Sequence, residues 1–298
     1  IEEFADGILK QLLLALELQT TLPLPELLGP KPEPVELGLA TALSRVDFVD
    51  EGGQVGLSMG LHADNQVRTQ SLGSIQRDGC LEGEDEMFYY GWDRSFGGAM
   101  KTDVINAALF SVWRSGFLDG PIELGGLLDG LGGVGSLPIP LDDLELQLAW
   151  TSPPILNDCG GKGILQLEFG DLLAELDANL LGSEISAVLY VDAAISLFFG
   201  SSAEGLSVTV GDFAFLEVEI IEYEETKAGL LDIRDLLENQ LYGLLSGLIV
   251  GQSFGPLDLE PIALGDVVPG LPAEAVLDLG NLSISKEGGY VVLGADLL

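Results

Sequence analysis

The sequence predicts an α+β protein in which a long antiparallel meander of strands lies between two amphipathic helices. Three observations support this prediction: apolar residues recur at helical spacing in three segments, alternation at period two occupies much of the rest, and a helix followed by a strand pair occurs near both ends. The second occurrence is preceded by a helix and a series of strands with no counterpart in the first. The sequence therefore indicates an unequal internal duplication.

The first element is an amphipathic helix over residues 3 to 18. Its apolar face carries Phe4, Ile8, Leu9, Leu12, Leu13 and Leu16. A cluster of prolines from Pro23 to Pro34 stops helical structure. Alternation from Val35 to Leu61 then predicts two strands around a turn at Asp50-Glu51-Gly52-Gly53.

A connector over residues 64 to 98 separates the two copies. It contains the acidic run Glu82–Glu86, which predicts a solvated segment, and it ends in aromatic residues expected to pack at the junction, Phe88, Tyr89, Tyr90 and Trp92. The expected domains are the carboxy-terminal part of an incomplete first unit over residues 1–63, the connector over 64–98, and a complete second unit over 99–298.

The second unit opens with a helix over residues 102 to 115, ended by Gly116. A Gly-rich stretch leads to Pro140, and six strands are then predicted in succession: 144–150, 163–169, 172–180, 185–199, 206–210 and 213–223. A closing helix follows over residues 232 to 250, with leucines on one face.

A last hairpin spans Leu279 to Leu297 and turns at Lys286-Glu287-Gly288-Gly289. Glu51-Gly52-Gly53 of the first hairpin matches Glu287-Gly288-Gly289 of the last. The match supports the duplication.

Net charge and apolar content limit the classes of partner and function that this chain can have. The 298 residues carry a formal charge of −36, from 48 acidic and 12 basic residues. This charge makes nucleic acid an unlikely partner and disfavours docking on anionic lipid head groups. Hydrophobic residues make up 47% of the chain, yet no run of about 18 residues is continuously apolar. The apolar excess therefore fills a large core or lines a cavity for an apolar ligand, and composition leaves both open.

The two cysteines, Cys80 and Cys159, both lie in turn-like sequence. Their number and setting favour one disulfide, which implies an oxidising compartment; the alternative is two unpaired thiols. The start at Ile1 shows no signal peptide, as expected of a processed product.

The sequence matches two catalytic or phosphate-binding motifs, but neither is followed by the secondary structure that the motif requires. Gly56–Gly60 matches the G-x-S-x-G elbow of serine hydrolases, with His62 nearby, but the alternation predicts a strand there instead of a strand–turn–helix. Gly130–Gly135 matches G-x-G-x-x-G but leads into Pro138, which excludes a phosphate-binding helix. With one histidine and scattered acids, no catalytic metal site is expected. We expect no enzymatic activity.

One family resemblance rests on particular segments. Met100–Leu118, with the sequence MKTDVINAALFSVWRSGFL, resembles the opening helix of the carboxy-terminal barrel in the bactericidal/permeability-increasing family of the tubular lipid-binding superfamily. Leu137–Ile139 and Thr151–Leu156 resemble the strands that follow, Leu293–Leu297 resembles the last strand, and residues 1–63 resemble the end of the preceding barrel. The resemblance implies two pseudosymmetric barrels, each a long, highly curved antiparallel sheet wrapped around helices, that hold acyl chains in apolar grooves. The family's basic tip has no equivalent in this acidic chain, so a bactericidal role is not expected.

We therefore expect a lipid-binding protein without cofactor that holds the acyl chains of a phospholipid or fatty acid, for carriage or transfer between membranes, with transient membrane contact. The alternative is a structural or partner-binding protein with a filled core and no ligand. Either would be secreted or periplasmic. The candidate lining residues, which also fit ordinary core positions, are Ala108, Leu109, Val112, Trp113, Leu167, Val188, Tyr190, Phe215, Leu241, Leu244 and Leu248.

Overall fold

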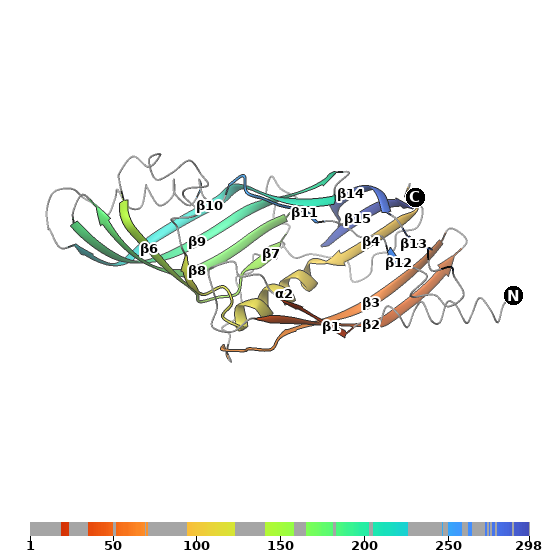
Figure 1. Ribbon diagram of the computed structural model, residues 1–298, viewed down its shortest axis with the longest axis horizontal. Helices are drawn as coiled ribbons and strands as arrows, with labels where there is room; N and C mark the ends of the chain where they lie inside the picture. The colour runs from red at the N-terminus through yellow and green to blue at the C-terminus, as the bar shows by residue number, and fades with distance from the viewer. Residues whose placement is uncertain are drawn as a thin grey trace.

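The computed structural model shows an elongated molecule built mostly of antiparallel strands (Figure 1). The residues it describes are 19–23, 35–49, 52–68, 70, 94–122, 141–157, 165–180, 183–202, 205–225, 246, 250–257, 262–263, 272, 274, 276–277, 279–287 and 289–297.

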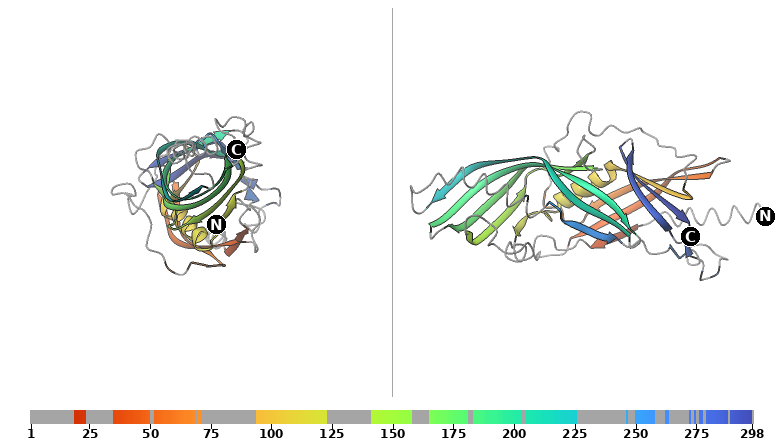
Figure 2. Two further views of the ribbon diagram at one scale, coloured as in Figure 1. Left: turned by 90° about the vertical axis from the view of Figure 1, so that its left-hand side faces the viewer. Right: turned by 90° about the horizontal axis from the view of Figure 1, so that it is seen from above.

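The largest sheet has seven strands in the order β11-β10-β9-β8-β6-β5, with β7 also paired to β8. Its strands are β5 (Gly120–Ile122), β6 (Leu141–Trp150), β7 (Ile155–Asn157), β8 (Leu165–Leu180), β9 (Ser183–Ser202), β10 (Gly205–Glu225) and β11 (Ser253–Leu257). Viewed down the long axis of the molecule, this long sheet curls around that axis (Figure 2, left). β8, β9 and β10 pair in the order of the sequence and β6 pairs with β8, all antiparallel, as the predicted meander requires.

The described residues also form three smaller sheets. The first holds β1 (Gln19–Pro23), β2 (Glu36–Val49) and β3 (Gly52–Ala63); the second holds β14 (Leu279–Glu287), β15 (Tyr290–Leu297) and β4 (Phe96–Lys101); the third pairs β12 (Ile262–Ala263) with β13 (Val276–Leu277). The β2–β3 and β14–β15 hairpins confirm the two predicted hairpins.

Helix α2 (Thr102–Arg114) follows β4 directly and confirms the predicted opening helix of the second unit to within one residue. It lies near the middle of the molecule, between β3 and β7 (Figure 1). Gly116 ends it with a φ of 70°, and a Cβ there would come within 2.7 Å of a Val67 methyl group. Glycine therefore suits this position for both conformation and space.

The predicted α+β class, with a sheet wrapped around helices, is wrong. The described residues are mainly β-strand, and the one extended helix among them, α2, packs beside the sheets. The other two predicted helices, 3–18 and 232–250, lie outside the described residues apart from Ser246 and Val250. The strands are also longer than expected: the four predicted from 163 to 180 and from 206 to 223 merge into β8 and β10, because bulges carry each strand through its break.

Of the described residues, no helix is long and apolar enough to cross a bilayer.

Candidate functional site

One face of the long sheet is apolar along its length. Its side chains come from β6, β8, β9 and β10 and form one buried cluster: Leu146, Leu148, Phe169, Leu172, Ala174, Leu176, Ala178, Ile185, Ala187, Leu189, Val191, Ala193, Ile195, Val210 and Ile220. We call this the apolar face. Four alanines lie among the larger side chains: Ala174, Ala178, Ala187 and Ala193.

The alternation of β9 sets which residues belong to this face. Successive side chains of a strand point to opposite sides, so Ala187 and Leu189 lie on the apolar face while Ser186 is exposed on the other. Across the ladder, Ala187 pairs with Leu176 and Leu189 with Ala174. The register therefore places small residues beside leucines in neighbouring strands.

A bulge in β8 keeps both ends of that strand on the same face. The register shifts between Phe169 and Leu172, where Asp171 has a φ of 50°. The Asp171 N–H donates to a carboxylate oxygen of Asp192 at 2.6 Å. Since Phe169 and Leu172 are an odd number of residues apart, a regular strand would point them to opposite sides, and the bulge brings both into the apolar face.

The opposite face is rich in carboxylates. Glu175, Asp177, Glu217, Glu219 and Glu222 are all exposed there. Because the charged face is wet and the apolar face is buried, the sheet curls with its apolar side chains inward.

Three of the predicted lining residues lie on this acidic face. Val188 pairs with Glu175 and Glu222, and Tyr190 pairs with Leu173 and Glu219. Phe215 pairs with Ala194, on the side opposite to the neighbouring Phe213, which packs against the apolar cluster. All three are half-buried.

The predicted residues of α2 face different neighbours. Leu109 packs with Leu167 of β8 in a cluster around Leu156, Leu165 and Val291.

Val112 packs instead against Val35, Ala63 and Phe117. Ala108 is half-buried. The helix therefore joins two apolar clusters, and among the predicted lining residues that the structure describes, Leu109 and Leu167 are the pair that meets in one cluster.

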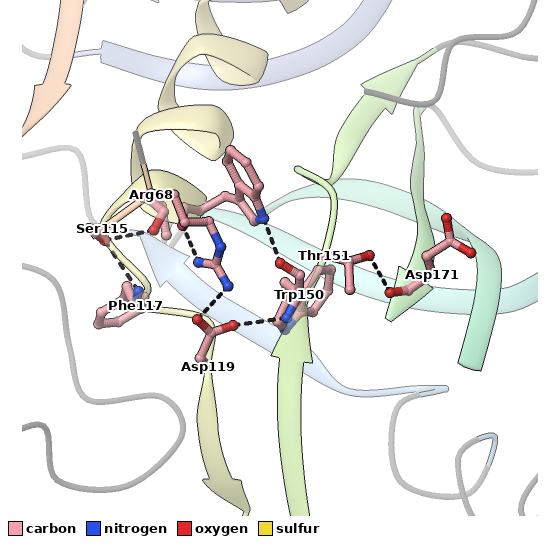
Figure 3. Close-up of polar contacts among 9 residues, drawn as sticks. Arg68, Ser115, Phe117, Asp119, Trp150, Thr151 and Asp171 are labelled. Atoms are coloured by element: carbon pink, nitrogen blue, oxygen red, sulfur yellow. Dashed lines mark hydrogen bonds and ion pairs between the residues drawn. The ribbon is translucent and has the colours of Figure 1, made fainter. Parts of the chain in front are cut away.

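Trp113 is 2% exposed and is held by polar contacts at the end of α2. Its indole N–H donates to the Trp150 carbonyl at 2.7 Å (Figure 3). Trp150 in turn packs against Phe169, with ring centroids 5.1 Å apart. Trp113 therefore links the helix to the rim of the apolar face.

Arg68 connects the segment that follows β3 to the residues around Trp113. Its guanidinium donates to the Trp113 carbonyl at 2.6 Å, pairs with the Asp119 carboxylate, and lies 5.0 Å from the Trp113 ring centroid (Figure 3). Asp119 also accepts from the Trp150 N–H at 2.8 Å. One arginine thus ties the chain after β3 to α2 and β6.

At the far end of the molecule, Asp296 of β15 accepts a hydrogen bond from Asn281, which lowers the pKa of its carboxyl. Desolvation opposes this effect, and the positive charge of Arg94 lowers the pKa further. The Arg94 guanidinium donates to Asp296 at 2.8 Å. The Arg94–Asp296 ion pair connects β15 to the segment before β4 and lies away from the apolar face.

Several predicted residues lie outside the described part of the chain. They are Leu241, Leu244 and Leu248 of the closing helix, the aromatic residues Phe88, Tyr89, Tyr90 and Trp92, and both cysteines, Cys80 and Cys159.

The serine-hydrolase motif lies in a strand, as predicted. Ser58 and His62 are both exposed on β3, and the His62 ring lies against Gly38, where a Cβ would be 2.3 Å from it. His62 is also 3.6 Å from the Asp64 carboxylate. No strand–turn–helix surrounds Ser58, and among the residues described no group of three potential ligands could hold a metal ion.

The sequence reasoning missed the residues that dominate the apolar face, such as Ala187, Leu189 and Val191. A signal for them was present: in 184–196, Ser186 and Asp192 mark the even-numbered positions as the wet side.

No family model and no curated protein matches the sequence. Among solved structures, the crystal structure of lipopolysaccharide binding protein resembles this chain with a TM-score of 0.28 and 11% sequence identity, over 89% of this chain and 75% of that one. A likeness at this level does not establish a shared fold, so membership of the bactericidal/permeability-increasing family stays a prediction.

Proposed function

We propose that this protein binds lipid, holding acyl chains against the apolar face of the long sheet. The observation that supports the proposal is the continuity of that face across β6, β8, β9 and β10, inside a sheet that curls around the long axis (Figure 2). The ligand would be a phospholipid or fatty acid, and the activity would be carriage without chemistry.

The strands give the apolar face a length suited to acyl chains. On β9 the apolar face runs from Ile185 to Ile195. At about 3.3 Å per residue this stretch is roughly 33 Å long, enough for an extended acyl chain.

The energetics need no specific polar partner. Burial of a methylene group contributes about 0.8 kcal/mol, so an acyl chain gains affinity in proportion to the length that leaves water. The carboxylates of the opposite face, including Glu175 and Glu219, keep the outside of the sheet hydrated. They also disfavour approach to anionic membranes, so exchange would occur at neutral surfaces.

Exchange of lipid between membranes, and a location in the periplasm or outside the cell, belong to the same proposal. So does a disulfide between Cys80 and Cys159, which such a compartment would permit.

Substitution of a central alanine tests the proposal. Ala187 is buried among leucines on the apolar face, while the adjacent Ser186 is exposed on the acidic face. If acyl chains lie against Ala187, the Ala187→Phe variant should retain its fold and carry less lipid. Native mass spectrometry of the purified full chain, with lipid extraction, measures the bound lipid.

The control is Ser186→Phe, which adds the same ring to the other face and should leave lipid content unchanged. A filled core would behave differently: the wild-type chain would carry no lipid, and Ala187→Phe would lower the free energy of unfolding by about 1–3 kcal/mol through overpacking. That pair of results would overturn the proposal in favour of a structural or partner-binding role.

A further inference from the structure

One indole N–H inside the long sheet has no acceptor within the part of the chain that the structure describes. It belongs to Trp150, the last residue of β6, whose Nε1 atom is buried without a hydrogen-bond partner. A buried indole N–H usually finds an acceptor, because an unpaired donor loses its hydration without compensation. Such a donor calls for an explanation, and a ligand that brings an acceptor is one.

Trp150 directs its side chain to the apolar face. It continues the alternation of Leu146 and Leu148 along β6, and it pairs with Leu172 of β8. Its ring packs against the apolar cluster. The indole N–H therefore lies on the side of the sheet where the acyl chains of the proposed function would lie.

A second buried indole beside it has the acceptor that Trp150 lacks. The Trp113 N–H donates to the Trp150 carbonyl at 2.7 Å. Two tryptophans thus meet at the rim of the apolar face, and among the described groups an acceptor is present for the Trp113 indole alone. The missing acceptor therefore belongs beside the Trp150 ring.

The other contacts of Trp150 fix its position. Its backbone N–H donates to an Asp119 carboxylate oxygen at 2.8 Å, and its carbonyl accepts from Trp113 (Figure 3). Its ring centroid lies 5.1 Å from that of Phe169. The indole is thus held in place before a ligand arrives, which lowers the entropic cost of binding.

The charges near Trp150 favour an uncharged acceptor. Asp119 is already paired with Arg68. The residue after Trp150 donates to the Asp171 carbonyl, and the Asp171 N–H donates to the Asp192 carboxylate. These contacts bring three aspartates and one arginine together. An ionised carboxylate buried on the apolar face here would compete for a cation that is already paired, and a buried charge without its own partner is costly.

We infer that Trp150 is the polar anchor of the lipid site: its indole N–H donates a hydrogen bond to the ester carbonyl of a bound acyl lipid. The inference rests on the proposed function and narrows it to lipids whose acyl chains are joined through esters. An ester carbonyl is uncharged and needs one donor, which is what the buried indole offers. From this point the acyl chain would follow the apolar face.

Two phosphatidylcholines that differ only in their linkage test the inference. The diester form carries the ester carbonyls, whereas the diether form of equal chain length lacks them and keeps the same head group. The purified full chain is incubated with vesicles that contain both lipids in equal amounts, and native mass spectrometry measures the ratio in which they are loaded. The wild-type chain should prefer the diester by about fivefold, the effect of one hydrogen bond.

Two variants separate the donor from the ring. Trp150→Phe removes the N–H and keeps an aromatic ring beside Phe169, so the variant should load both lipids without preference. Phe169→Leu is the matched control, because it removes aromatic area from the same contact and leaves the donor in place. It should weaken the loading of both lipids alike and keep the preference for the diester. Circular dichroism checks that both variants are folded.

The indole N–H signals of the wild-type chain provide a measure that needs no variant. The chain has three tryptophans, so nuclear magnetic resonance can follow one signal from each ring. The diester lipid should shift one of these signals downfield, as expected when an N–H donates a new hydrogen bond. The diether lipid should leave the same signal nearly unchanged.

Equal loading of the two lipids by the wild-type chain would overturn the inference and leave the proposed function standing. Loading of neither lipid would overturn both. A preference for the diester that survives in Trp150→Phe would reject Trp150 as the anchor. Palmitate that displaces the diester and shifts the same indole signal would assign the donor to a carboxylate, against the inference.

Discussion

At the scale of single residues, the junction beside Trp113 depends on one side chain. The Arg68 guanidinium contacts a helix-end carbonyl, an aromatic ring and the Asp119 carboxylate at once, and only 20% of its side chain is exposed. The planar guanidinium of arginine can make these three contacts at once, whereas the ammonium of lysine is a single point charge.

Arg68→Ala should therefore lower the free energy of unfolding by about 1.5–3 kcal/mol, the range for hydrogen bonds to charged groups. Urea unfolding followed by tryptophan fluorescence measures the loss. Arg68→Lys separates charge from geometry: we expect it to restore only part of the stability. Full restoration would show that the charge alone matters.

At the scale of elements, the bulge in β8 places Phe169 and Leu172 on the same face, which alternation along the strand alone would not predict. Asp171 adopts a φ of 50°, which glycine tolerates freely and β-branched residues adopt at high cost.

Asp171→Gly should accordingly be neutral or stabilising by up to about 1 kcal/mol, and Asp171→Val should be destabilising by about 1–3 kcal/mol. Thermal unfolding of the two variants side by side measures the difference. If Val were tolerated as well as Gly, the bulge conformation would not be required for the strand.

The same bulge shows where sequence reasoning succeeded and failed. Helix α2 and the two hairpins could be predicted because their signals are local: helical spacing before Gly116, and glycine turns between alternating residues. The breaks in the predicted strands were not chain reversals, because a bulge and a turn look alike in a single sequence.

The faces of the long sheet were harder to assign than its strands. In β9 both sets of alternate positions contain apolar residues, so apolar character alone does not separate Val188 and Tyr190 from Ala187 and Leu189. Ser186 and Asp192 mark the side of Val188 as the exposed one, and the register adds that Val188 pairs with Glu175 and Glu222. The sequence predicts which residues of one strand share a face, but it does not predict which residues of the adjacent strands pair with them.

At the scale of the whole molecule, charge opposes compactness. A formal charge of −36 repels itself, and the outer face of the long sheet concentrates carboxylates such as Glu217 and Glu219. Salt shortens the range of this repulsion, from a Debye length of about 30 Å at 0.01 M to about 8 Å at 0.15 M.

The melting temperature should therefore rise by several degrees as sodium chloride increases from about 0.01 M to about 0.15 M. Differential scanning calorimetry at pH 7 measures this. Substituting Glu219→Gln should reduce the dependence slightly, because one of the repelling charges is gone. A melting temperature independent of salt would mean that the acidic face is already neutralised by bound cations.

The pairing of β4 with β15 has a consequence for biosynthesis. β4 and α2 leave the ribosome before any strand of the long sheet, yet the strand that β4 pairs with emerges only after that sheet is finished. Until then the cluster around Ile105 and Leu109 of α2 contains Leu156 and Leu165 but lacks Val291 of β15. The final structure can therefore be completed only after translation has passed β15.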